Sequence, residues 1–223
     1  MLQSIVFDLD GTLLDSERVM RTALERSYRQ VVGLGPVPFD EFVKHLGESI
    51  PRILDLLNLP QAMGEIFRRI SVEKVDELVF HEGSREILAW ARARGIRSSI
   101  LTGKDHRRTL LILEHFQVQD WFDAVVCSDQ LTFPKPHPEG LQHLARLFNV
   151  APDATVYICD SPNDVECAQR AGVRSIGVTW GIKPDQFLAR CKPDHVVETW
   201  TELSTLLCTL HEEPATQATA ATG

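Results

Sequence analysis

Two aspartates stand one residue apart near the start of the chain, directly after a short run that contains β-branched residues. The run from Ser4 to Phe7 is typical of a buried strand, and Asp8 and Asp10 follow it. Side chains two positions apart in an extended chain project in the same direction, so both carboxylates leave the strand together. Because such acids repel each other, they need a cation between them, or one must hold a proton. Both arrangements serve phosphoryl transfer.

A lone pair of aspartates at this spacing has simpler explanations, of which a solvated strand end is the commonest. A calcium-binding loop also begins with this pair, but it has glycine at its sixth position and glutamate at its twelfth. Here Gly11 is fourth and Val19 is twelfth, so the calcium interpretation fails. Further polar groups at the ends of other strands are needed before the pair can be interpreted as a functional site rather than as a solvated strand end.

Polar residues that can bind phosphate or metal follow three later apolar runs. They are, in chain order, Thr102, Gly103, Lys135, Asp160 and Asp164. Ligands of open parallel sheets bind beyond the carboxyl ends of the strands, so these groups are expected at one edge of one sheet. Taken singly, Thr102 is more simply a helix cap and Lys135 a surface lysine. Together, in this order, they favour a shared site.

The spacing of apolar residues predicts a parallel α/β sheet interrupted by a helical block. Beyond residue 81, short apolar runs alternate with helical patterns, which favours βαβ units with right-handed crossovers. After the first strand, the expected strands are 96–101, 124–127, 155–159, 174–178 and 195–197. Residues 16–80 show no strand pattern, and their expected helices are 16–32, 40–46, 50–58 and 61–80. The predicted fold class is α/β, a Rossmann-like parallel sheet with an inserted all-helical domain.

The composition narrows the classes of partner and compartment. A formal net charge of −8 disfavours nucleic acid and anionic membranes, so an anionic substrate must meet locally placed positive charge. Five cysteines without C-x-x-C spacing indicate reduced thiols and a cytoplasmic location rather than disulfides or a zinc site. No signal peptide is expected before the first strand, and no apolar run is long enough to span a bilayer. Residues 212–223 show no apolar period and are expected to be disordered.

Four segments resemble the four ordered motifs of the haloacid dehalogenase (HAD) superfamily. They are Asp8-x-Asp10-Gly11-Thr12, Leu101-Thr102-Gly103, Lys135-Pro136 and Asp160-Ser161-x-x-Asp164. The helical block is similar to the cap of the branch that contains phosphoglycolate phosphatase and β-phosphoglucomutase. This resemblance implies a catalytic core, residues 1–15 and 81–211, and a helical cap, residues 16–80. Cys159 departs from the pattern, since the family usually has glycine before the fourth-motif aspartate.

The resemblance also implies a role for each motif residue, which agrees with its chemistry. Asp8 is the expected nucleophile, which forms an aspartyl-phosphate. Asp10 is the expected general acid and then base, with a pKa raised by the neighbouring Asp8. Lys135 is expected to neutralise the phosphoryl group, and Thr102 with the Gly103 N–H to bind its oxygens. The implied cofactor is Mg²⁺, which prefers oxygen ligands. Its expected ligands are the side chains of Asp8 and Asp160 and the backbone carbonyl of Asp10. Asp164 is expected next to these ligands, without binding the metal directly.

The second aspartate separates the reactions of this superfamily. Haloacid dehalogenases and phosphonatases lack an acid at the position of Asp10, so its presence favours phosphate esters. β-Phosphoglucomutases carry a histidine in the following helix, whereas residues 17–26 contain none, which favours a phosphatase. The expected substrate is a small phosphorylated metabolite: a phosphosugar, a phosphoglycolate-like ester, or an amino-cyclitol or amino-sugar phosphate. The alternatives are a β-phosphoglucomutase-type phosphomutase and a catalytically silent HAD-like binding protein.

Specificity is expected to reside in the cap, at the segment 44–52. Arg52 or Lys44 is placed to meet an anionic group of the substrate, and Glu48 or Ser49 a hydroxyl or amine, although a solvated helix end is an equally simple interpretation. The basic segment 106–108 is expected to form an exposed helix face. Residues between 19 and 60 are also similar to HAD phosphatases found beside 3-amino-5-hydroxybenzoate synthesis, which act on phosphorylated amino sugars or cyclitol-like compounds.

Overall fold

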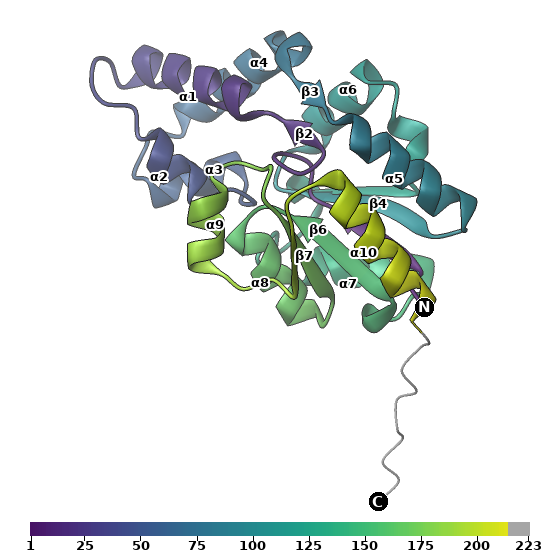
Figure 1. The fold of residues 1–223 in the computed structure, drawn as a ribbon. Coiled ribbons are helices and arrows are strands. Elements are labelled where there is room, and N and C mark those ends of the chain that lie inside the picture. The colour runs from purple at the N-terminus through teal and green to yellow at the C-terminus, as the bar shows by residue number, and fades with distance from the viewer. Residues whose placement is uncertain (214–223) are drawn as a thin grey trace, which may run out of the picture.

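The computed structural model describes residues 1–213 and shows a layered α/β core with a block of helices beside it (Figure 1). The core contains one sheet of six parallel strands in the order β5-β4-β1-β6-β7-β8. The strands are β1 (Ser4–Phe7), β4 (Arg97–Thr102), β5 (Ala124–Cys127), β6 (Thr155–Cys159), β7 (Arg174–Val178) and β8 (His195–Val197). Since β1 lies at the centre, between β4 and β6, its carboxyl end opens onto the middle of one sheet edge. The predicted parallel sheet is confirmed.

Alternating side chains of β1 pack into two separate layers. Ile5 and Phe7 are fully buried on one face, and Val6 is fully buried on the other. The first face is covered by α5 (Glu82–Ala93), α6 (His106–His115) and α10 (Trp200–Glu212). The second face is covered by α7 (Glu139–Phe148), α8 (Pro162–Ala171) and α9 (Pro184–Arg190). Because helices cover both faces of the sheet, polar groups are expected at its carboxyl edge.

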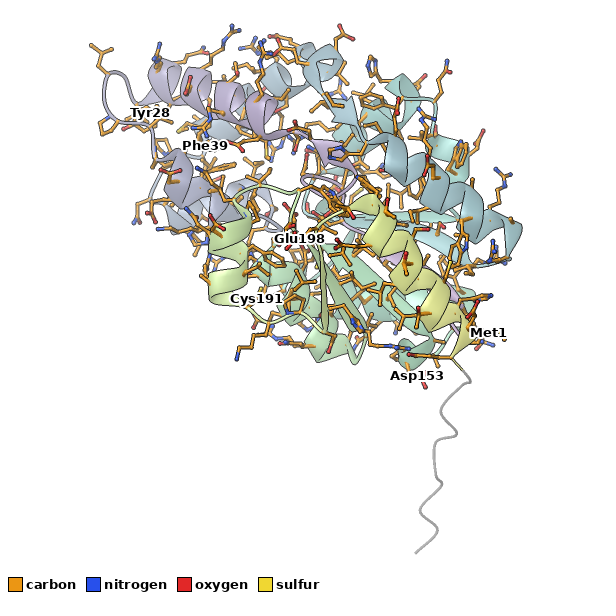
Figure 2. All side chains as sticks on the ribbon, viewed as in Figure 1. Met1, Tyr28, Phe39, Asp153, Cys191 and Glu198 are labelled. Atoms are coloured by element: carbon orange, nitrogen blue, oxygen red, sulfur yellow. The ribbon has the colours of Figure 1, made fainter. Side chains whose placement is uncertain are left out.

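The helical block has an apolar core of its own. Its helices are α1 (Glu17–Val31), α2 (Phe39–Val43), α3 (Ile50–Leu56) and α4 (Ala62–Glu73). Leu24, Phe42 and Ile53 are buried at its centre, where the aromatic rings of Phe42 and Phe67 lie 5.7 Å apart. Figure 2 shows Phe39 in this block, well away from Asp153 at the far end of the molecule. The block therefore packs around its own side chains and meets the sheet only near the carboxyl edge.

The predicted helix 61–80 is wrong in its last third. α4 ends at Glu73, a 3-10 turn follows, and β3 (Val79–Phe80) pairs antiparallel with β2 (Leu14–Asp15). This pairing joins two segments far apart in the sequence, and it buries Leu14 and Phe80, so local periodicity does not reveal it. The two short strands carry the chain from the core into the block and back.

The C-terminal prediction falls mostly outside the described residues. Of the expected disordered tail 212–223, the structure describes only Glu212, which ends α10, and Glu213. Among the helices of residues 1–213, none has both the length and the apolar character needed to cross a membrane.

Candidate active site

The carboxyl ends of β1, β4 and β6 bring the predicted polar groups to one edge of the sheet. Asp8, Thr102 and Asp160 lie at the ends of these three strands, and all three are buried. Lys135 enters from the loop before α7, and Asp164 from the first turn of α8. The structure thus brings together side chains from four separate segments.

Lys135 is the centre of this cluster. Its ammonium lies 2.8 Å from Asp8 Oδ1 and 2.5 Å from Asp164 Oδ1, and the lysine side chain is only 2 % exposed. Burial opposes the positive charge, but the attraction of Asp164 and Asp8 outweighs it and raises the pKa of Lys135 above its usual range. The two ion pairs therefore favour the charged form of Lys135, which fixes one oxygen of Asp8.

Tyr157 is a member of the cluster that the sequence analysis missed. It lies in the middle of β6, and its hydroxyl accepts a hydrogen bond of 3.0 Å from Lys135. The same hydroxyl donates a hydrogen bond of 2.8 Å to Asp164. A tyrosine within an otherwise apolar buried strand is the one signal in the sequence, because a buried hydroxyl needs partners.

Three buried carboxylates in the cluster compete for the single ammonium group. Burial, opposed by Lys135, raises the pKa of Asp8 from its ordinary value of 3.8 to about 7. Burial and the nearby Asp8 raise the pKa of Asp160 well above its usual value. Asp160 Oδ1 is buried and has no hydrogen-bond partner among residues 1–213. The cluster is therefore short of positive charge.

These residues fit a divalent cation. Carboxylate oxygens of Asp8, Asp160 and Asp164 all lie within 4.8 Å of one another, and hard oxygen donors of this kind suit Mg²⁺. Gly11 leaves room beside them, since a Cβ at this position would lie 1.9 Å from Asp160 Oδ2. Its φ of +79° is also the conformation that lets the chain turn away after Asp10.

Asp10 has a different environment from Asp8. Lys104 Nζ lies 2.8 Å from Asp10 Oδ2, and both side chains are largely buried. Burial would raise the pKa of Asp10, but the charge and hydrogen bond of Lys104 outweigh it and lower that pKa below its usual value. The predicted raised pKa of Asp10 is therefore wrong, because it considered repulsion from Asp8 and overlooked Lys104. The position of Lys104 directly after Thr102-Gly103 was the available signal.

Thr102 and Gly103 line a small pocket together with Asp8 and Asp10, as expected for groups that bind a phosphoryl oxygen. The helical block comes very close to the core here. A Cβ added to Gly103 would lie 2.4 Å from the carbonyl oxygen of Gly47, which belongs to the segment between α2 and α3. Glycine at position 103 is thus required by the contact between the two parts of the molecule.

The side of this pocket formed by the helical block is mainly apolar. Met20, Leu46, Ile50 and Phe67 are among its lining residues, with Glu48 as a polar exception. Half-burial raises the pKa of Glu48, although Arg52 opposes the shift. Arg52 itself is exposed on α3 and is not among the residues that line the pocket.

The structure contradicts part of the prediction for the segment 106–108. Arg107 is exposed as expected, but Arg108 is only 5 % exposed, so the prediction of an exposed face is wrong for Arg108. Its guanidinium lies over the ring of Phe67, 5.9 Å from the centroid, and donates a 2.6 Å hydrogen bond to Asp105. The contact with the buried ring of Phe67 turns the side chain of Arg108 toward the pocket that contains Asp8 and Asp10.

Polar contacts join the helical block to the core around the site. The side-chain amide of Asn163 donates a 2.9 Å hydrogen bond to the carbonyl of Leu46. Arg190 donates one of 2.6 Å to the carbonyl of Lys44. Both acceptors lie in the first half of the segment between α2 and α3, so these bonds hold this segment against the core.

Cys159 is accommodated without disturbing the packing. It is fully buried at the end of β6, opposite Gly177 of β7, and belongs to the same apolar cluster as Phe187. Burial raises the pKa of its thiol well above the usual value, so the sulfur stays neutral beside the carboxylates.

Comparisons with known proteins agree with this geometry. The family described as haloacid dehalogenase-like hydrolase matches residues 5–178. Pyrophosphatase PpaX of Bacillus mycoides is 25% identical over 209 residues, covering 92% of this chain and 97% of the relative. Phosphoglycolate phosphatase of Pseudomonas putida is 28% identical over 208 residues, covering 87% of this chain and 75% of the relative. The crystal structure of a hydrolase from Pseudomonas syringae shares the fold, with a TM-score of 0.81, 19% identity, and coverage of 93% of this chain and 98% of that one.

Proposed function

The chain belongs to the haloacid dehalogenase-like hydrolase family, and we propose that it is a Mg²⁺-dependent phosphatase acting on a small phosphomonoester. The observation that carries the proposal is the buried pair of Asp8 and Lys135 beside two more carboxylates. It combines a nucleophile, a cation for the phosphoryl group and oxygen donors for a metal. The relatives named as pyrophosphatase and phosphoglycolate phosphatase support phosphate-ester or phosphoanhydride chemistry.

The proposed reaction has two steps, each with a role for both aspartates of the first motif. In the first, the carboxylate of Asp8 forms a bond to phosphorus, the ester P–O bond breaks, and Asp10 gives its proton to the leaving alkoxide. In the second, water attacks the phosphorus, Asp10 takes a proton from that water, and the bond to Asp8 breaks. The products are an alcohol and inorganic phosphate, and both aspartates return to their first state.

Lys104 must change its contact during this cycle. The ion pair in the structure favours the deprotonated form of Asp10, which is the form that accepts a proton from water. Proton donation in the first step requires the other form, so Lys104 has to leave Asp10 when the substrate arrives. The phosphoryl group, which is anionic, is the natural new partner for this ammonium.

The carboxylates of Asp8, Asp160 and Asp164 would hold the metal. A bound Mg²⁺ supplies positive charge that offsets the negative charge of the phosphoryl group and of the cluster itself. Lys135 keeps Asp8 in place and adds a second positive charge on the same side. Thr102 and the backbone of Gly103 complete the set of groups that face the phosphoryl oxygens.

We treat residues 16–80 as a cap that closes over the core, residues 1–15 and 81–211. The separate apolar core of α1–α4 and the two-strand connection through β2 and β3 support this division. The close approach of Gly47 to Gly103 and the residues of the helical block that line the catalytic pocket support a role of the cap in excluding water from the attacked phosphorus.

The test is turnover of p-nitrophenyl phosphate with Mg²⁺ by the full chain. We expect phosphate release in the wild type, loss of at least about a thousandfold in Asp8→Asn, and none after metal removal with EDTA. Asp153→Asn, an exposed change far from the site, is the matched control and should keep full activity. Asp8→Asn with wild-type turnover would refute the nucleophile, and no turnover in the wild type would favour a binding protein. Following isomer and free phosphate together from a sugar phosphate separates a phosphatase from a phosphomutase.

A further inference from the structure

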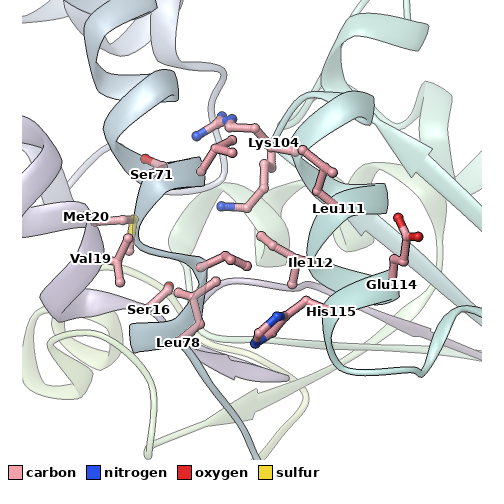
Figure 3. Close-up of a pocket in the computed structure, with 13 residues that line it drawn as sticks. Ser16, Val19, Met20, Ser71, Leu78, Lys104, Leu111, Ile112, Glu114 and His115 are labelled. Atoms are coloured by element: carbon pink, nitrogen blue, oxygen red, sulfur yellow. The ribbon is translucent and has the colours of Figure 1, made fainter.

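A second cavity lies next to the catalytic pocket, between α1, α4 and α6 (Figure 3). Its volume is about 260 Å³, and we call it the α4–α6 cleft. Its apolar lining includes Val19, Met20, Leu78, Leu111 and Ile112. Glu114 and His115 also line it, so the cleft combines mainly apolar walls with polar groups on α6.

The cleft directly adjoins the catalytic pocket. Met20, Lys104 and Arg108 line both cavities. Figure 3 shows the side chain of Lys104 reaching into the cleft, and its ammonium is the group that lies 2.8 Å from Asp10. This ion pair, Met20 and Arg108 therefore form the wall between the cleft and the pocket of the carboxylate that would protonate the leaving oxygen. An organic group attached to that oxygen has the cleft directly beyond it.

Few polar groups in the cleft can receive hydroxyl groups. Arg108 is paired with Asp105, and Lys104 with Asp10. The hydroxyl of Ser16 is buried and has no hydrogen-bond partner among residues 1–213. Ser16 and the exposed Glu114 and His115 of α6 can receive a few polar substituents, whereas a sugar with many hydroxyls would leave those against the apolar walls unpaired at a high cost.

The size of the cleft suits a substituted ring. An aliphatic cavity of about 150 Å³ binds benzene, so about 260 Å³ takes a six-membered ring with a further substituent. The walls supply the apolar contact that makes such burial favourable.

We propose that the α4–α6 cleft binds the organic group of the substrate and selects phosphomonoesters of cyclic or aromatic alcohols with few hydroxyl groups. This inference rests on the proposed phosphatase function, and it names the substrate class of that site. It disfavours the heavily hydroxylated sugar phosphates among the expected substrates. The movement of Lys104 from Asp10 to the phosphoryl group opens the passage from the catalytic pocket into the cleft.

The test compares two esters that differ only in their hydroxyl groups. Cyclohexyl phosphate and inositol monophosphate are both phosphate esters of a secondary alcohol on a six-membered carbon ring. With Mg²⁺, the wild type is expected to show a kcat/KM at least about tenfold higher for cyclohexyl phosphate. Acetyl phosphate, whose organic group is too small to fill the cleft, serves as the reference substrate.

Two variants place a charge in the cleft at partly exposed positions, Leu111→Glu and Val72→Glu. The ratio of kcat/KM for cyclohexyl phosphate to that for acetyl phosphate should fall at least about tenfold in both. Leu147→Glu, an exposed leucine of α7 outside the cleft, is the matched control and should keep the wild-type ratio.

The outcomes separate this inference from the proposed function. If acetyl phosphate is not hydrolysed with Mg²⁺, the phosphatase proposal fails. If it is hydrolysed but cyclohexyl phosphate has no advantage over inositol monophosphate, or the ratio is the same in all variants, only the role of the cleft is overturned. The wild-type comparison decides this even if a variant does not fold.

Discussion

Gly103→Ala is expected to push the helical block away from the catalytic edge while leaving both parts folded. A Cβ at position 103 would lie 2.4 Å from the carbonyl oxygen of Gly47 and 2.8 Å from that of Glu48. Ordinary van der Waals contact begins at 3.4 Å, so the segment around Gly47 must retreat by about 1 Å. The backbone N–H at position 103, which is expected to bind a phosphoryl oxygen, is unchanged. A displacement of about 1 Å at a catalytic site costs about a hundredfold in rate, and we expect this loss in kcat/KM.

The measurement is kcat/KM for p-nitrophenyl phosphate with Mg²⁺, together with a thermal unfolding curve. Gly64→Ala is the matched control, since a Cβ there meets nothing closer than 3.5 Å, at Leu54. Alanine inside a helix stabilises by about 1 kcal/mol relative to glycine, so this control should be more stable and fully active. Wild-type kcat/KM in Gly103→Ala would show that the close approach of Gly47 has no part in catalysis. Loss of activity caused by unfolding would also contradict the reasoning.

Three further predictions concern the buried charges and the contact between the two parts. Lys135→Met leaves carboxylates without their cation, so we expect a loss of about 3–5 kcal/mol in unfolding free energy, measured with urea, and no phosphate release. Burial raises the pKa of Asp8 from 3.8 to about 7, so the folded protein holds a proton there more tightly than the unfolded chain does. The metal-free protein should therefore lose stability as the pH rises from about 4 to about 7. Added Mg²⁺ should raise Tm more at pH about 8 than at pH about 5, because the metal binds the deprotonated carboxylate. A larger rise in Tm at pH about 5 would contradict the metal site. Asn163→Ala removes one hydrogen bond to Leu46, worth about 1 kcal/mol, and should raise KM about fivefold with little change in Tm; an unchanged KM would show that this bond does not help closure.

The strands in the second half of the chain were the easiest elements to predict. The bounds of β5, β6, β7 and β8 match the prediction, because β-branched and apolar runs between turn residues leave little choice. β3 was missed because its only reason to be extended is its pairing with β2. α9 lies in a stretch for which no helix was predicted, and it covers the sheet through the single buried side chain of Phe187.

The residues of the candidate site also differ in how well the sequence predicts that they meet. Asp8, Thr102 and Asp160 were predicted to meet because they end strands of one parallel sheet, and topology alone brings them together. Lys104 and Tyr157 act through the reach of long side chains across neighbouring strands, which no spacing rule describes. Their partners became visible only with the packed structure.

The contrast between Asp8 and Asp10 follows from the charges around each of them. Asp8 shares the single ammonium of Lys135 with Asp164, and Asp160 forms no ion pair within the described part of the chain, so three carboxylates face one cation. The deficit is two charges, which is the charge of Mg²⁺. Asp10 has Lys104 to itself and is balanced without a metal. Two acids one residue apart are therefore suited to different roles, since one belongs to a cluster short of positive charge, where we propose the metal, and the other to an ion pair that, in the proposed reaction, the substrate anion opens.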